Sequence, residues 1–354
     1  MNRILEVISC TIGRTGVVLL VVFLPAAVLL SIASGDAEAK ERRALVTVSV
    51  KLVSPPSAKT VRLWVPYPMS DGSQEITDVE VVGNFTRQGV YREGKFGNPI
   101  LFAEWRNVSG ERTVSYTFRV SRKELVTRDF PEKELPYSRE EFRKELAPAS
   151  VVPTDGPVME IAGRITAGKT TNREKARAIY DWIVDNMRRD PNTKGCGLGE
   201  VEGLLSSLGG KCADLHSVFV ALARAAEVPA REAFGIRLPK GAEGDMTKAQ
   251  HCWAEWYLPG YGWVVVDPAD VRKAILERKI AVEEAGPLRE YYFGAVDESR
   301  IAFGTGRDLV LNPPQAGVPL NYFMYPYAEA DGRPLNEDLY GFNLGYTIRY
   351  KEIM

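Results

Sequence analysis

The sequence predicts an α+β fold in which an antiparallel β-sandwich precedes a domain of mixed helices and strands. Between residues 45 and 126, apolar and polar side chains alternate with the period of two that half-buried antiparallel strands show. From residue 171 onward, apolar side chains instead recur at helical spacing, and short strands rich in β-branched residues follow. The two patterns occupy separate parts of the chain, so we expect two domains.

The alternation is clearest in residues 46–52, 61–65 and 113–120. Turn sequences such as SPPS, SDGS and VSGE separate the strand segments. We assign residues 42–126 to the β-sandwich domain. This segment contains neither Cys nor His, so we expect nucleophilic catalysis to lie elsewhere.

The rest of the folded chain divides into three parts. Residues 127–153 are charged and contain several prolines, which indicates a linker. Residues 154–300 form the second domain, and residues 301–354 are expected to be a C-terminal extension packed on its core. In the second domain we predict helices over 171–189 (begun by a capping box of Thr171 and Glu174), over 201–208 and from Cys212 onward, and strands over 229–238, 251–258 and 262–267.

The first 39 residues have the order of a secretory signal. Arg3 and Arg14 precede an apolar run over residues 17–33, and Ala37 and Ala39 form a small-residue cleavage site. The alternative is an uncleaved membrane anchor. With either interpretation the folded part is exported, to the periplasm or the extracellular space, and the protein contacts the membrane only if the segment is not cleaved.

The overall charge argues against one class of partner. The chain has 46 acidic and 45 basic residues, which gives no basic surface for nucleic acid. We therefore expect no nucleic-acid partner.

Cys212 is the candidate nucleophile. It follows the sequence GGK at the predicted start of a helix. A helix N-terminus favours the thiolate, which is the reactive form of cysteine. The alternative is a small buried residue with a structural role.

The chain has two histidines that could serve as its base. If the hairpin after His251 turns at Gly260, Asp267 lies on the same face as His251, as its diagonal neighbour. A register shifted by one residue would place Asp267 on the other face. His216 lies one turn after Cys212, and no orienting partner is evident for it, so we interpret it as a polar residue flanking the site.

A metal site is the competing chemical interpretation. Cys212, His216, His251 and Cys252 offer two thiols and two imidazoles. Adjacent residues of a strand point to opposite faces, so His251 and Cys252 do not easily reach one ion. The sequence also lacks a C-x-x-C motif, and we predict no metal ligands.

Four segments resemble the transglutaminase-like superfamily. They are GGKC, RAAEVPAR, HCWAE and GWVVVDP, within residues 174–268. The resemblance implies a papain-like α+β core whose triad is Cys212, His251 and Asp267. The chain departs from the family at Glu227, where Gly is usual. The family's upstream oxyanion-stabilising side chain has no clear counterpart here, which leaves the backbone N–H of Cys212 as the one assigned donor.

The resemblance also implies a reaction. Cys212 attacks a protein or peptide amide, and the resulting thioester passes to an amine or to water, giving cross-linking, deamidation or proteolysis without a cofactor. The substrate is a protein or peptide, with the cell envelope as one source. The alternative function is a catalytically idle module that binds peptides or the cell wall.

Overall fold

The computed structural model describes residues 40–107 and 109–354. The export segment predicted for residues 1–39 lies outside the described residues. No helix in the described part is long and apolar enough to cross a membrane.

The described chain up to residue 126 is built of strands, and the α-helices come between residues 143 and 291. The strands up to residue 126 are β1 (Glu41–Leu52), β2 (Thr60–Pro66), β3 (Gln74–Gly83), β4 (Arg87–Arg92), β5 (Pro99–Arg106), β6 (Arg112–Lys123) and β7 (Leu125–Val126). The elements that follow, as far as the first residues of the core sheet, are α1 (Arg143–Leu146), α2 (Gly156–Ile165), α3 (Asn172–Asn186), β8 (Arg188–Arg189), α4 (Val201–Ser207), β9 (Gly209–Gly210) and α5 (Cys212–Ala225). The remaining elements are β10 (Ala230–Arg237), β11 (Glu243–Asp245), β12 (Gln250–Leu258), β13 (Gly262–Val266), α6 (Pro268–Arg278), η1 (Glu283–Ala285), α7 (Gly286–Tyr291), β14 (Ala295–Val296), β15 (Arg300–Thr305), β16 (Tyr327–Ala330), β17 (Arg333–Pro334), η2 (Phe342–Leu344) and β18 (Tyr346–Glu352).

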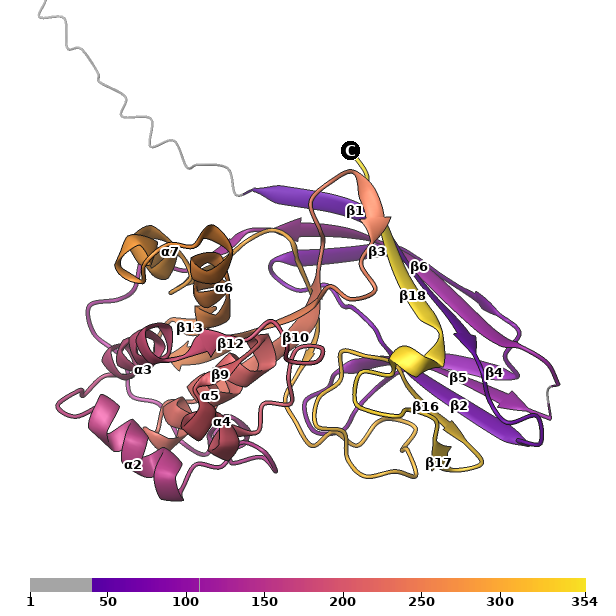
Figure 1. The fold of residues 1–354 in the computed structure, drawn as a ribbon, viewed down its shortest axis with the longest axis horizontal. Coiled ribbons are helices and arrows are strands. Elements are labelled where there is room, and N and C mark those ends of the chain that lie inside the picture. Colours follow the sequence, from indigo (N-terminus) through magenta and orange to yellow (C-terminus); the bar gives the residue numbers. More distant parts are fainter. Residues whose placement is uncertain (1–39, 108) are drawn as a thin grey trace, which may run out of the picture. The chain divides into compact units, whose positions relative to one another are not determined.

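Two five-stranded antiparallel sheets form the sandwich, with strand orders β11-β18-β1-β6-β3 and β17-β16-β2-β5-β4. Alternate residues of β1 and β6 point inward, and their side chains share one apolar core with those of β2. The outer face of β2 is also covered, because Trp64 packs with Phe102 and Leu309 in a second cluster. The predicted period-two strands therefore form the two sheets of this sandwich (Figure 1).

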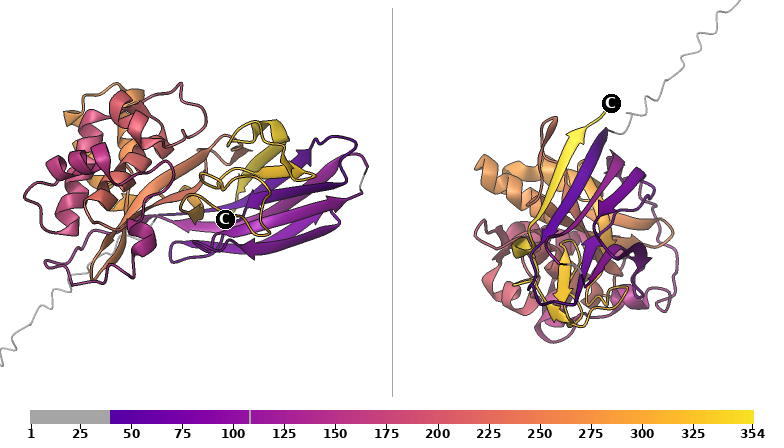
Figure 2. Two further views of the ribbon diagram at one scale, coloured as in Figure 1. Left: turned by 90° about the horizontal axis from the view of Figure 1, so that it is seen from below. Right: turned by 90° about the vertical axis from the view of Figure 1, so that its right-hand side faces the viewer.

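The end of the chain completes the sandwich. The strand β18 pairs with β1 in register from Val50↔Tyr346 to Ala44↔Glu352, and β16 pairs with β2. Figure 2 shows the C-terminal strand beside the first one. The sequence analysis placed residues 301–354 on the second domain, but β16, β17 and β18 belong to the sandwich sheets. Strand pairing between distant segments has no local sequence signal, which is why the pattern did not reveal it.

The second domain surrounds one helix. Its sheet has the order β13-β12-β10-β15, and α5 packs against β12 and β10. Every residue of α5 from Cys212 to Arg224 is buried, so the helix is enclosed by α2, α3, α4 and α6 as well as by the sheet. A helix that is buried all round belongs at the centre of a domain. The predicted helix start at Cys212 is confirmed.

The hairpin of β12 and β13 has the register on which the His–Asp argument depends. Leu258 pairs with Gly262 and Ala254 with Val266, so the next position places Asp267 opposite Trp253. The prediction that Asp267 lies on the face of His251 is therefore confirmed.

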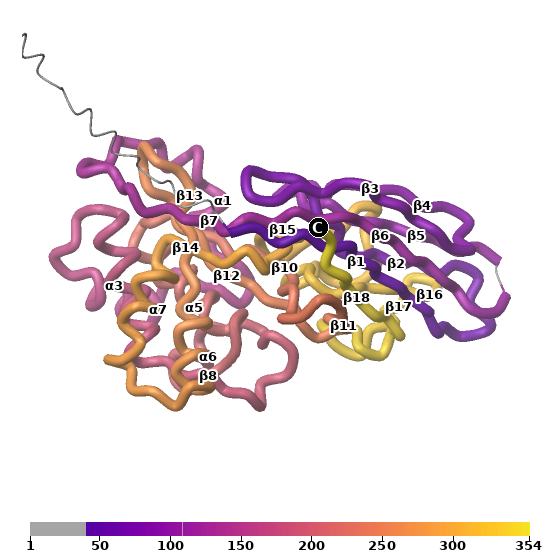
Figure 3. The backbone as a smooth tube through the Cα atoms, turned by 90° about the horizontal axis from the view of Figure 1, so that it is seen from above, coloured from indigo at the N-terminus to yellow at the C-terminus, as the bar shows by residue number. Residues whose placement is uncertain are grey.

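One loop joins the second domain to the sandwich. Between β10 and β12 the chain leaves the core sheet, and β11 pairs there with β18 (Figure 3). Arg122 of β6 also donates a hydrogen bond from Nε to the carbonyl of Arg300, at 2.5 Å. The sandwich therefore positions both this loop and the start of β15.

Candidate active site

Cys212 is the first residue of α5, and its side chain is 3 % exposed. Asp214, in the first turn, accepts hydrogen bonds from the backbone N–H of Lys211 and of Gly199, each at 2.9 Å. A carboxylate at this position satisfies backbone donors that a helix start leaves free. Asp214 therefore fixes the start of the helix and ties it to the loop that carries Cys196.

The Cys196 loop lies close against α5 because glycine occupies the contact positions. Gly197 has φ 92°, and a Cβ on it would overlap the carboxylate of Asp214. The N–H of Ala213 donates to the carbonyl of Cys196 at 2.9 Å. A larger residue at Gly197 would push Cys196 away from Cys212.

His251 and Asp267 are hydrogen-bonded. His251 lies in β12, and its Nε2 is 2.9 Å from Oδ2 of Asp267, which is the N-cap of α6. Asp267 is fully buried, so its carboxylate is ionised only because donors compensate it. The bond assigns the proton to Nε2 of His251, which leaves Nδ1 as the acceptor nitrogen of the neutral ring.

Asp267 has three further donors. Its Oδ1 accepts from Nε2 of His216 at 3.2 Å and from the N–H of Asp270 at 2.8 Å, and Arg300 donates from Nη1 to Oδ2. Nη1 of Arg300 also lies 3.1 Å from Nε2 of His251. Since both nitrogens donate to one oxygen, this short separation is a consequence of their shared acceptor.

The environment favours ionisation of both Cys212 and His251. Interactions with the thiols of Cys196 and Cys252 hold the pKa of Cys212 well below its ordinary value; burial opposes this shift, and His251 adds to it. Burial and the charge of Arg237 lower the pKa of His251, but the carboxylates of Asp270 and Asp267 outweigh them and the net pKa is raised. Both shifts favour the thiolate–imidazolium pair over the neutral thiol and imidazole.

The other two cysteines stay protonated. A hydrogen bond to Cys212 and then burial raise the pKa of Cys196 well above its ordinary value. Burial and then the contact with Cys212 do the same for Cys252. None of the three cysteines within residues 40–354 that the structure describes forms a disulfide.

Known proteins are similar to this chain in sequence and in fold. The model of the Transglutaminase-like superfamily matches residues 159–268. An uncharacterized protein of Haemophilus influenzae is 37% identical over 319 residues, which cover 82% of this chain and 86% of that protein. Residues 159–268 are a domain of the transglutaminase-like superfamily.

A solved structure supports the same fold across both domains. It is that of a proposed cysteine protease from Cytophaga hutchinsonii, with a TM-score of 0.53 and 15% identity, covering 88% of this chain and 98% of that one. The predicted α+β class, with a transglutaminase-like core after a strand-rich region, is confirmed.

His216 is more closely involved in this transglutaminase-like site than the sequence analysis expected. We found no partner for it along the helix, but Asp267 reaches it from the start of α6, and its Nδ1 lies 3.4 Å from Sγ of Cys252. The side chain is fully buried. The partner was missed because it lies 51 residues away in the sequence.

The structure also tests whether the acids around His251 suit a metal ion. Ligand atoms of His251, Asp267 and Asp270 lie within 4.8 Å of one another. Arg300 already contacts all three, since Nη2 donates to Asp270 at 2.7 Å while Nη1 faces the other two. The guanidinium of Arg300 supplies the positive charge that a metal ion would otherwise supply to these carboxylates. The arrangement therefore favours the arginine over a bound metal.

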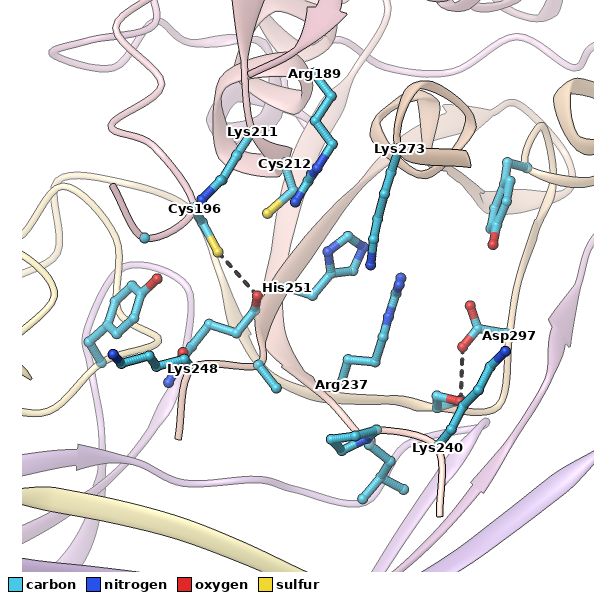
Figure 4. Close-up of a pocket in the computed structure, with 18 of the residues that line it drawn as sticks. Arg189, Cys196, Lys211, Cys212, Arg237, Lys240, Lys248, His251, Lys273 and Asp297 are labelled. Carbon is cyan, nitrogen blue, oxygen red and sulfur yellow. Dashed lines mark hydrogen bonds between the residues drawn. The ribbon is translucent and has the colours of Figure 1, made fainter. Parts of the chain in front are cut away.

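Cys212 and His251 line one cavity of about 840 Å³ (Figure 4). Cys196 and Gln250 also line this cavity, as do Tyr325 and Phe342 of the C-terminal segment. The sequence analysis did not identify Arg300 or this C-terminal wall. Neither has a motif, because Arg300 reaches the site through the pairing of β15 with β10, and Tyr325 and Phe342 come from distant segments before β16 and β18.

Proposed function

We propose that this protein is an exported cysteine acyl-transfer enzyme that acts on protein or peptide amides through a thioester. The observation that carries the proposal is the buried bond between His251 and Asp267 beside a Cys212 whose pKa is well below its ordinary value. A helix-start cysteine, a histidine and an orienting aspartate are the groups that nucleophilic acyl transfer requires.

The first half-reaction forms the thioester. Nδ1 of His251 holds the proton of the Cys212 thiol, and the thiolate attacks the amide carbonyl carbon. The carbonyl π electrons move to the oxygen, which the backbone N–H of Cys212 stabilises as a donor at the helix start. When the intermediate collapses, the C–N bond breaks and the imidazolium gives its proton to the leaving amine.

The second half-reaction releases the acyl group. An amine or water loses a proton to Nδ1 of His251 and attacks the thioester carbonyl, and the C–S bond then breaks. Amine attack gives a cross-link, whereas water gives deamidation or proteolysis. Asp267 holds the tautomer of His251 and supports its positive charge in both steps.

Export is the part of the proposal that rests on residues 1–39 alone. A basic start, an apolar run and an A-x-A site support it. Mass spectrometry of the N-terminal peptide from fractionated cells tests it: cleavage after Ala39 or an intact membrane-bound segment supports export, and an intact cytoplasmic chain contradicts it.

The catalytic proposal is tested by thiol labelling followed by product analysis. The native protein is treated with limiting iodoacetamide near neutral pH, and peptide mapping measures the rate at Cys212, Cys196 and Cys252. It is then incubated with tryptic peptides and a fluorescent primary amine, with Cys212→Ala as the matched control. We expect selective labelling of Cys212 and amine-labelled, deamidated or cleaved peptides that the control lacks. Equal labelling of the three thiols, or identical products from both proteins, would contradict the proposal and favour an idle binding module.

A further inference from the structure

The cavity at Cys212 is lined almost entirely by one sign of charge. Asp297 is its one acidic residue among those the structure describes. Six basic side chains line it: Arg189, Lys211, Arg237, Lys240, Lys248 and Lys273. The chain as a whole has 45 basic and 46 acidic residues, so this excess is local to the cavity.

Asp297 does not offset these charges. Its Oδ2 accepts from Arg300 at Nε, 3.1 Å away, and at Nη2, 3.0 Å away. Burial raises the pKa of Asp297, but the charge of Arg300 outweighs burial and the net pKa is well below the ordinary value. The carboxylate is therefore ionised, and it is compensated chiefly by Arg300, which is outside the basic set, and to a smaller extent by Arg237.

Most of the basic side chains have no acidic partner. Arg237 contacts Asp270, and Nζ of Lys273 lies 3.8 Å from Glu277. The other four form no ion pair with any residue in 40–107 or 109–354. Unpaired cations that face one cavity attract an anion, because the low-dielectric walls concentrate their field there.

The cations surround the reacting groups. Figure 4 shows Lys273 and Arg237 extending from different walls toward the imidazole of His251, while Arg189 and Lys211 lie beside Cys212. Lys248 belongs to the loop between β10 and β12, which the sandwich holds through β11. Positive charge is therefore available on both sides of a carbonyl that sits on Cys212.

We propose that the acyl substrate is an acidic peptide, with carboxylates on both sides of the amide that reacts with Cys212. The inference rests on the proposed function, because the amide chemistry makes the ligand a peptide and the cations select its charge. A peptide carboxylate is of the right size to meet a lysine ammonium or an arginine guanidinium within the cavity. The sandwich takes part in recognition by holding the loop that carries Lys240 and Lys248.

Two peptide chloromethyl ketones of equal size test the proposal. Acetyl-Glu-Glu-Gly and acetyl-Gln-Gln-Gly chloromethyl ketone differ in charge and hardly in shape. Each alkylates a thiolate by forming an S–C bond as chloride leaves. The second-order rate at Cys212 is measured on the native protein by mass spectrometry. We expect the Glu probe to react about tenfold faster or more at low ionic strength. Most of that advantage should vanish near 1 M salt, where charges are screened within about 3 Å.

A triple variant assigns the preference to the cavity. Lys240→Gln, Lys248→Gln and Lys273→Gln together should reduce the Glu/Gln rate ratio at low salt by at least about threefold. These three side chains are partly or fully exposed, and none bonds to a buried carboxylate, so the fold is expected to tolerate the changes.

A second triple variant with the same net charge is the control. Lys59→Gln, Lys133→Gln and Lys169→Gln remove three exposed lysines that do not line the cavity. It should keep the ratio of the parent.

The outcomes separate the two proposals. Equal rates for the two probes, or an equal fall of the ratio in both triple variants, overturn the acidic-peptide inference and leave the acyl-transfer proposal in place. If neither probe labels Cys212 faster than it labels Cys196 and Cys252, the proposed function itself fails and the substrate inference fails with it.

Discussion

Replacing Asp267 by Asn tests the buried network directly. The two side chains are almost the same size, so the sequence alone predicts an intact fold and a loss of activity. The structure predicts a second effect. Asp267 is fully buried and accepts from four donors: two imidazoles, the N–H of Asp270 and the guanidinium of Arg300. The amide of the variant keeps one acceptor oxygen. Its NH2 group faces partners that are themselves donors, so it cannot form hydrogen bonds with them.

The magnitude follows from the bonds that are lost. At least two charge-assisted hydrogen bonds disappear, each worth about 1.5–3 kcal/mol, and Arg300 loses one of its buried counter-charges. We therefore expect Asp267→Asn to lower the free energy of unfolding by about 3–5 kcal/mol, as for other broken buried ion pairs. Turnover of an amide substrate should also fall by about a hundredfold or more, because His251 loses its orienting partner.

The stability effect should depend on pH with a definite sign. Burial raises the pKa of Asp267, but Arg300, His251 and His216 outweigh it, so the folded-state pKa is well below the unfolded value near 3.9. A carboxylate with a lowered pKa stabilises the fold above the unfolded pKa, and this contribution is lost as the pH falls through the folded-state pKa. The gap between parent and variant should therefore be full at neutral pH and narrow in strong acid.

Urea unfolding of the parent and the variant measures both effects, with exposed Asp129→Asn as the matched control. The control should unfold within about 0.5 kcal/mol of the parent. A loss below about 1 kcal/mol for Asp267→Asn would refute the argument that this carboxylate compensates the buried cations.

Three further predictions concern the thiol and the sandwich. His251→Ala should abolish the fast reaction of Cys212 with iodoacetamide between about pH 5 and 8, whereas His216→Ala should slow it much less; the reverse order would show that His216 is the base. Because the pKa of Cys212 is lowered and that of Cys196 is raised, mapped alkylation should reach Cys212 at pH values where Cys196 stays protonated, and parallel pH profiles would contradict this. Deleting residues 346–354 removes the three buried side chains of β18, so urea unfolding should show a loss of about 5 kcal/mol; an unchanged midpoint would mean that this strand does not support the sandwich.

Local signals predicted the parts of the site that depend on nearby residues. The PGYG turn and the alternation on either side of it fix the register of the β12–β13 hairpin, and that register carries Asp267 to the face of His251. The glycines and lysine before Cys212 likewise predicted the helix start. These features follow from residues within one hairpin or one helical turn, so a single sequence specifies them.

Long-range partners could not be predicted in this way. Arg300 enters the network from β15, and Asp267 reaches His216 across the packed helices. When the flanking residues show no strong periodicity, the sequence does not distinguish a buried arginine from a surface arginine. The strand pairing of β18 with β1 was hidden for the same reason.

The network explains how His251 gains a proton although two arginines lie near it. Burial opposes the imidazolium, and so does the charge of Arg237. Three carboxylates and two guanidinium groups are hydrogen-bonded to one another around the imidazole, and together they carry one net negative charge. These groups belong to Asp267, Asp270, Asp297, Arg237 and Arg300. With Asp267 alone, Arg300 would cancel the charge that His251 needs. The additional acids let Arg300 fix the position of Asp267 while the surroundings still favour the imidazolium. The other five basic side chains of the cavity lie outside this network.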